Sequence, residues 1–164
     1  MATMVNLFSL SIRIKQVTQE ILHTHGNLHS LLDLELKSEA ADDAVEMLIV
    51  CSSRFKSLKI FRLYGPIMGL IFEAGAMPQL EQLSIEIRAC QGQSGLAENS
   101  DLGIHHLTSL RDLNIWINCG GAQMEEVEML EAAITNAINL LPNKPKPQFY
   151  RENQDNMVTN EAHV

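Results

Sequence analysis

Apolar and polar residues alternate along the stretch LEQLSIEI, residues 80–87. In an extended chain, Leu83, Ile85 and Ile87 would lie on one face, and the polar residues between them would lie on the other. This pattern predicts a half-buried β-strand. The same spacing occurs at several other places along the chain, which raises the question of whether this strand is one copy of a repeat.

In each copy of the repeated pattern, apolar residues occupy the first, fourth, seventh and ninth positions of a nine-residue segment. The four apolar positions of every copy are Leu, Ile, Phe or Met, and these residue types together make up about 0.3 of the chain. The whole set of copies would therefore arise by chance with a probability on the order of 10⁻⁴. Between successive copies the step is 24, 27, 22 and 30 residues, close to the period of roughly 20–29 residues typical of leucine-rich repeats. The copies are Met4–Leu7–Leu10–Ile12, Leu28–Leu31–Leu34–Leu36, Phe55–Leu58–Phe61–Leu63, Met77–Leu80–Leu83–Ile85 and Leu107–Leu110–Leu113–Ile115.

This period predicts an α/β fold, a leucine-rich-repeat solenoid with about five repeats in residues 1–119. Stacked copies would bury one column of apolar residues and form a curved parallel sheet on the concave side, with helices and loops on the convex side. Residues 15–27 and 39–53 show helical spacing, the latter more strongly. Residues 64–78 contain too much Gly and Pro for a long helix, and residues 88–103 read as a polar loop.

The C-terminal part follows a different pattern. Met124, Val127, Leu130, Ile134 and Ile138 form one helical stripe, and four glutamates favour its N-terminal half. Residues 120–142 are therefore predicted to be a capping helix that closes the end of the solenoid. Residues 143–164 are polar and contain prolines, so we expect a disordered tail.

The composition narrows the possible partners and the compartment. The net charge of −8 disfavours nucleic acid, because no basic patch neutralises phosphates. The apolar runs are too short to span a membrane, and the N-terminus does not resemble a signal peptide. Three widely spaced cysteines, Cys51, Cys90 and Cys119, fit reduced thiols in the cytoplasm better than disulfides or a zinc site.

Candidate catalytic and metal-binding residues are sparse. His23, His25 and His29 lie close together, but no carboxylate or cysteine completes a ligand set, so surface histidines at a turn are the simpler interpretation. His105 and His106 come just before a predicted strand and are most simply part of the repeat. No nucleophile is arranged with a base, and no Ser-centred elbow occurs. We expect neither an enzyme nor a cofactor or metal site.

The concave face is the more promising surface, because residues between the apolar positions point away from the core. We predict a protein-binding site there, centred on Arg62, Tyr64, Glu86 and Trp116, because Tyr, Trp and Arg are frequent anchors. For Trp116 the alternative is packing under the capping helix or the tail. The register predicts Lys37, Tyr64, Glu86 and Trp116 in one row, and the further candidates are Asp33, Glu35 and Asp112.

Three phrases of the chain resemble a known family. They are FEAGAMPQLEQLSIEI (72–87), LGIHHLTSLRDLNIWINCGGA (102–122) and EEVEMLEAAITNAINLLPNKP (125–145). They resemble the C-terminal leucine-rich repeats of grass coiled-coil nucleotide-binding leucine-rich-repeat disease-resistance proteins. The resemblance implies a non-enzymatic module that recognises pathogen effectors, or a guarded host protein, and holds the receptor's nucleotide-binding switch off.

The chain departs from that family in lacking the phosphate loop G-x-x-x-x-G-K-[ST], so nucleotide binding is not carried over. It resembles only the end of such a receptor, as in a truncated form. Two alternatives remain: a generic repeat adaptor unrelated to defence, and a non-functional remnant. Because a repeat opens at Met4 without a preceding cap, we expect an exposed first strand edge and a marginally stable or self-associating chain.

Overall fold

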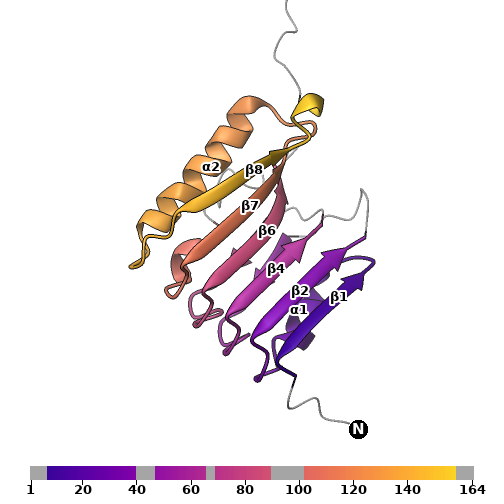
Figure 1. Cartoon of the computed structure of the whole chain (residues 1–164), viewed down its shortest axis with the longest axis vertical. Coiled ribbons are helices and arrows are strands. Elements are labelled where there is room, and N and C mark those ends of the chain that lie inside the picture. Colours follow the sequence, from indigo (N-terminus) through magenta and orange to yellow (C-terminus); the bar gives the residue numbers. More distant parts are fainter. Residues whose placement is uncertain (1–6, 40–46, 66–68, 90–101, 158–164) are drawn as a thin grey trace, which may run out of the picture.

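A computed structural model describes residues 7–39, 47–65, 69–89 and 102–157 of the chain. Its main feature is a sheet of six parallel strands in the order β1-β2-β4-β6-β7-β8 (Figure 1). The strands are β1 (Ser9–Ile14), β2 (Asp33–Ser38), β4 (Ile60–Tyr64), β6 (Gln82–Arg88), β7 (Asp112–Asn118) and β8 (Pro147–Glu152). The predicted parallel sheet is confirmed, and its first five strands coincide with the five copies of the repeat.

The second layer covers one face of this sheet, which we call the inward face. It contains helix α1 (Gln19–His25), a two-stranded parallel sheet of β3 (Met47–Val50) and β5 (Gly69–Phe72), the short 3₁₀-helix η1 (Ile104–His106) and helix α2 (Met124–Asn139). A second 3₁₀-helix, η2 (Gln154–Asn156), follows β8. The opposite, outward face is the side seen in Figure 1.

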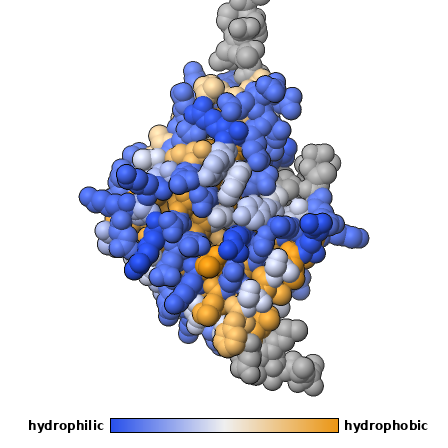
Figure 2. Space-filling view, in the orientation of Figure 1, coloured by the Kyte–Doolittle hydropathy of each residue, from blue (hydrophilic) through white to orange (hydrophobic). Residues whose placement is uncertain are grey.

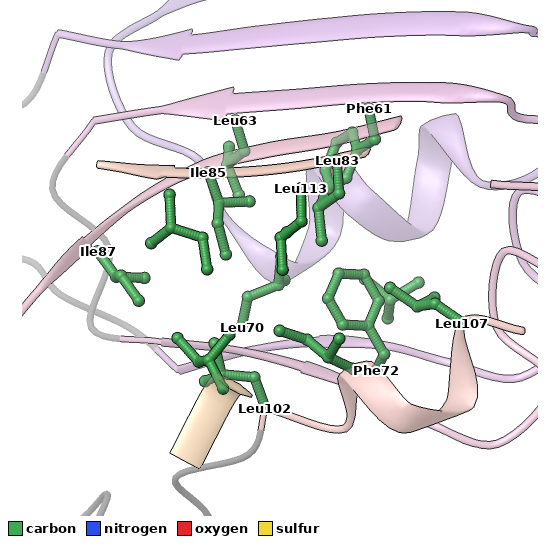
Figure 3. Close-up of a cluster of buried hydrophobic side chains, with 14 of the residues drawn as sticks. Phe61, Leu63, Leu70, Phe72, Leu83, Ile85, Ile87, Leu102, Leu107 and Leu113 are labelled. Atoms are coloured by element: carbon green, nitrogen blue, oxygen red, sulfur yellow. The ribbon is translucent and has the colours of Figure 1, made fainter. Parts of the chain in front are cut away.

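Alternation along each strand places the core between the two layers. In β4, β6 and β7 every second residue is buried and the residues between are partly exposed. Figure 3 shows Leu63 and Ile85 of the sheet directed toward Leu70 and Phe72 of β5 and toward Leu102. Among the described residues the fully buried side chains are apolar, and no polar or charged residue is buried, so burial of apolar surface is the main stabilising term.

Both helices begin at identifiable caps. The Thr18 hydroxyl accepts a hydrogen bond from the Ile21 N–H at 3.3 Å, and α1 ends at Gly26. Helix α2 begins with a capping box between Gln123 and Glu126. The helices expected in residues 15–27 and 120–142 are thus present, with shorter bounds.

The helix expected in residues 39–53 differs from the structure. Residues 40–46 lie outside the described residues, but Met47–Val50 is strand β3, paired with β5. Leu48 and Val50 are buried, whereas Ile49 is partly exposed, as alternation in a strand requires. The Gln19 side chain holds this strand by bonding the Ile49 N–H and C=O at 2.8 and 2.7 Å. Pairing with a distant segment has overridden the local helical spacing.

The disordered tail expected from residue 143 is also wrong for the described part of that segment. Pro147–Glu152 forms β8, which pairs with β7 in parallel from Leu113↔Pro147 to Asn118↔Glu152. The strand at this end of the sheet is therefore β8, and the expected capping helix α2 packs behind it (Figure 1). Residues 158–164, and residues 90–101 of the polar loop predicted at 88–103, lie outside the described residues.

Candidate functional site

Strand register brings the predicted site residues together on the outward face. Lys37 lies beside Tyr64, and Glu86 lies beside Trp116. The pairing of β4 with β6 reaches Leu63↔Ile85, so Tyr64 and Glu86 occupy the next position in the same row. The predicted row is therefore present in the structure, and it continues one strand further, because Trp116 is followed by Tyr150 on β8.

Three aromatic side chains, Tyr64, Trp116 and Tyr150, make continuous contact along this row, and we call them the aromatic row. The Trp116 ring is stacked on Tyr150, with centroids 5.0 Å apart and 20° between the planes. On its other side it meets Tyr64 at 5.6 Å and 76°, an edge-on arrangement. Both geometries are favourable for aromatic pairs. The row therefore forms a continuous aromatic surface built from three different strands.

Glu86 lies in the row between Tyr64 and Trp116, on the strand that separates them. Its carboxylate accepts a hydrogen bond from the Gly65 N–H at 3.2 Å. Burial raises the pKa of Glu86 above its usual value, the Gly65 hydrogen bond acts against that rise, and the negative charge of Glu152 adds to it. The site thus contains a carboxylate that is partly desolvated and repelled by a second one.

Four of the predicted charged residues form two ion pairs on β2 and β4. Arg62 Nη1 lies 3.0 Å from Asp33 Oδ1, and Lys37 Nζ lies 2.9 Å from Glu35 Oε1. The hydrogen bond from Lys37 lowers the pKa of Glu35 below its usual value. Arg62 is thus held by Asp33, while Lys37 also lies 6.0 Å above the Tyr64 ring, at the distance of a weak cation–π contact.

Asp112, the remaining predicted residue, lies away from the aromatic row. It lines a shallow polar depression of about 190 Å³ near the beginnings of β6, β7 and β8. Figure 2 shows that this side of the molecule is mainly hydrophilic, with hydrophobic surface gathered toward the β1 end, where Phe8 is 57% exposed. The other residues of the depression are Gln82, Leu113, Asn114, Lys146 and Gln148.

Tyr150 is the site residue that the sequence analysis missed. A signal for it exists, because Leu141, Lys144, Pro147 and Phe149 follow the spacing of the repeat with two substituted positions. The Lys144 N–H bonds the Leu141 carbonyl at 3.2 Å, as the Leu110 N–H bonds the Leu107 carbonyl in the preceding copy. The segment is therefore a degenerate sixth copy, and Tyr150 occupies the outward position that Trp116 has in the fifth.

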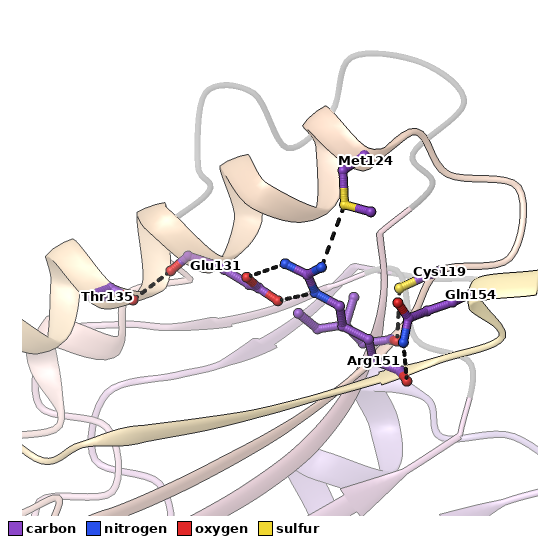
Figure 4. Close-up of polar contacts among 7 residues, drawn as sticks. Cys119, Met124, Glu131, Thr135, Arg151 and Gln154 are labelled. Carbon is purple, nitrogen blue, oxygen red and sulfur yellow. Dashed lines mark hydrogen bonds and ion pairs between the residues drawn. The ribbon is translucent and has the colours of Figure 1, made fainter. Parts of the chain in front are cut away.

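An ion pair on the inward face holds β8 in place. Arg151 Nε and Nη2 donate to the two carboxylate oxygens of Glu131 on α2 at 2.8 and 2.9 Å (Figure 4). This two-pronged geometry is the strong form of an Arg–carboxylate pair, and it raises the pKa of Arg151. Since Arg151 and Tyr150 are adjacent on β8, fixing one side chain inward orients the other outward.

The histidine and cysteine candidates are placed apart from this face. His23 Nε2 lies 2.8 Å from Arg54 Nη2, and His25 Nδ1 lies 2.8 Å from the Ile21 carbonyl. Within the described ranges, no three His, Cys, Asp or Glu side chains are grouped so as to hold a metal ion. Cys119 is buried, and burial raises the pKa of its thiol, which disfavours the reactive thiolate. Cys90 lies outside the described residues.

Comparison with known families agrees with the repeat seen in the sequence and the sheet. A family model described as a leucine-rich repeat region matches residues 1–147. The chain belongs to this leucine-rich repeat family. Such repeats present extended surfaces to other proteins, so its class is a protein-interaction module.

No solved structure matches the chain. In the part of the chain that the structure describes, neither helix combines the length and the apolar character needed to cross a bilayer.

Proposed function

We propose that this leucine-rich repeat region is the protein-binding end of a plant disease-resistance receptor. It contacts a pathogen effector, a guarded host protein or the switch domain of the same receptor through the outward face of its sheet. In this proposal the repeats form a solenoid, and the chain acts in the cytoplasm. It is not an enzyme and needs no cofactor. The three phrases in residues 72–145 that resemble grass receptors support the assignment to defence.

The observation that carries the binding role is the aromatic row on the outward face. Trp116 is fixed between two aromatic neighbours, Tyr64 and Tyr150, and its side chain is only partly buried. Aromatic residues that are rigid before binding lose little conformational entropy in a complex, and they are therefore frequent energetic centres of protein interfaces. The Arg62–Asp33 pair beside the row adds a positioned guanidinium.

The test uses the complete receptor that contains this chain, expressed in leaf cells with and without the effector. We expect Tyr64→Ala combined with Trp116→Ala to weaken association with the switch domain or the effector by roughly tenfold or more, the size expected for interface anchors. If the switch domain is the partner, the variant should also signal without the effector. Glu128→Ala combined with Met129→Ala, on the exposed side of α2, is the matched control.

Unchanged association and unchanged signalling at equal protein levels would overturn the proposal. Binding that depends on the aromatic row, but to a partner outside the receptor pathway, would make the chain a general repeat adaptor instead.

A further inference from the structure

The two ends of the aromatic row are occupied differently. At the Tyr64 end the chain supplies a cation of its own: Lys37 Nζ lies 6.0 Å from the ring centroid and 2.9 Å from the Glu35 carboxylate. A ring and a carboxylate together thus hold one ammonium group. This arrangement defines the chemistry for which the row is suited, because the face of an aromatic ring and a carboxylate both attract a cation.

The same two components, aromatic rings and carboxylates, recur at the other end. Trp116 and Tyr150 are stacked, and Tyr150 is 41% exposed. Glu86 lies beside Trp116, and Glu152 lies beyond Tyr150 on the outward side of β8. Within the described part of the chain, Lys37 over Tyr64 is the one cation that lies above an aromatic ring.

The two carboxylates flank the stacked rings, Glu86 on β6 beside Trp116 and Glu152 on β8 two residues beyond Tyr150, and they repel each other. The charge of Glu152 contributes to the raised pKa of Glu86, whereas the group that lowers it is the Gly65 amide rather than a basic side chain. Arg88, two residues beyond Glu86 on β6, is engaged in a contact of its own. A cation placed between Glu86 and Glu152 would relieve this repulsion and restore the balance found at Lys37.

We propose that the Trp116–Tyr150 end of the aromatic row receives an arginine or lysine side chain of the partner protein, held between the carboxylates of Glu86 and Glu152. This inference rests on the proposed function, in that the partner is a protein, and it adds the chemistry by which the partner is recognised. A short extended segment is sufficient, because the Trp116–Tyr150 end of the row, the two carboxylates and the neighbouring polar depression all lie on or beside β6, β7 and β8.

Trp116 is the one tryptophan in the chain, so its fluorescence reports directly on this end of the row. The purified chain is titrated with the peptide acetyl-Gly-Arg-Gly-Arg-Gly-amide and with the same peptide containing citrulline, which is neutral but nearly isosteric with arginine. We expect a saturable change in Trp116 emission, with the arginine peptide bound at least roughly fivefold more tightly than the citrulline peptide and less tightly as salt is raised.

The carboxylates are tested with Glu86→Gln and Glu152→Gln, each of which should weaken binding of the arginine peptide by roughly threefold or more. Glu128→Gln on α2 removes the same charge from the exposed side of that helix and should bind as the unaltered chain does. Circular dichroism at the titration temperature verifies that each variant is folded. Because the two carboxylates lie on different strands, two independent variants test the same site.

Three results would overturn the inference. The first is no saturable change in Trp116 emission up to about 5 mM peptide, a concentration well above that expected for a ring and two carboxylates acting together. The second is equal binding of the arginine and citrulline peptides. The third is unaltered binding of the arginine peptide by both Gln variants. Failure here is distinguishable from failure of the proposed function. Association within the receptor that requires Trp116 but neither glutamate would leave the binding role intact and refute only the basic side chain.

Discussion

Trp116 on β7 and Tyr150 on β8 are stacked, with centroids 5.0 Å apart and 20° between the planes. This contact joins one of the predicted site residues to a segment that composition alone would leave disordered. It also bears on the alternative that Trp116 packs under the capping helix or the tail. The ring does pack against the tail, but it does so on the outward face, so packing and a role in binding are compatible.

Removing the Tyr150 ring should loosen Trp116. We expect Tyr150→Ala to shift the Trp116 emission to longer wavelength and to lower the free energy of unfolding by about 1 kcal/mol, the size typical of an aromatic pair. Tyr150→Phe is the matched control: it removes the exposed hydroxyl that donates to Gln148 at 2.6 Å and keeps the ring. An unchanged emission maximum in Tyr150→Ala would show that the two rings do not stack.

The Arg151–Glu131 pair should contribute measurably to the stability of the chain. A double-mutant cycle with Arg151→Met and Glu131→Gln should give a coupling free energy of about 1–2 kcal/mol, because the bonds are charge-assisted and the side chains are only 29% and 20% exposed. The Arg111–Glu81 pair is the control, with atoms 3.9 Å apart and side chains 70% and 41% exposed. Its coupling should be near zero. Equal coupling in the two cycles would contradict the role assigned to Arg151.

Two glycines with similar backbone angles should differ in their tolerance of alanine. Gly103 has a φ of +70°, and a Cβ there would lie 2.2 Å from the Phe72 carbonyl oxygen, whereas Gly75 has a φ of +85° and its nearest neighbour would be 3.7 Å away. Gly103→Ala should therefore destabilise the chain by about 2 kcal/mol or more, and Gly75→Ala by about 1 kcal/mol. Denaturant unfolding of both variants checks this order, and a reversed order would be inconsistent with the close approach of η1 to β5.

Glu86 and Glu35 should affect stability with opposite signs as pH changes. The pKa of Glu86 is raised, so the ionised form destabilises the fold at neutral pH, and this cost disappears as pH falls below the ordinary value of 4.5. Glu86→Gln should therefore raise the free energy of unfolding at pH 7, and the gain should vanish in acid.

The pKa of Glu35 is lowered by Lys37, so ionised Glu35 stabilises the fold above 4.5, and this stabilisation is lost as pH falls through the lowered pKa. Glu35→Gln should be less stable than the unaltered chain at pH 7 and equal to it in strong acid. Chemical unfolding across this pH range measures both differences. A stability gain for Glu35→Gln at pH 7, or a loss for Glu86→Gln, would contradict the environments described for the two carboxylates.

The repeat pattern predicts the strands of the sheet well, because each copy places two apolar residues on the buried side of the same strand. Leu83 and Ile85 are both fully buried, as the pattern requires. The row of Lys37, Tyr64, Glu86 and Trp116 could be predicted for the same reason, since equal positions in parallel strands become neighbours.

The segments that the pattern misses owe their structure to partners distant in sequence. Strand β3 depends on pairing with β5 and on the Gln19 side chain, neither of which leaves a local signal. The copy that contains β8 has Lys144 and Pro147 where other copies have Leu, Ile, Phe or Met. In β8 itself, Arg151 is held inward by Glu131, twenty residues away. Sequence reasoning could not foresee how strongly Glu86 is desolvated, because that depends on the rings packed beside it.

In the proposed function, another protein covers the outward face, with Trp116 at its centre, in the functional assembly. Hydroxyl-radical footprinting tests this most directly, because it measures the accessibility of each side chain in the isolated chain and in the complete receptor, before and after effector is added. Oxidation of Trp116 and Tyr150 should fall severalfold in at least one receptor state, while Met129, which is 65% exposed on α2, should stay reactive. Equal oxidation of Trp116 and Tyr150 in the isolated chain and in both receptor states would contradict this expectation.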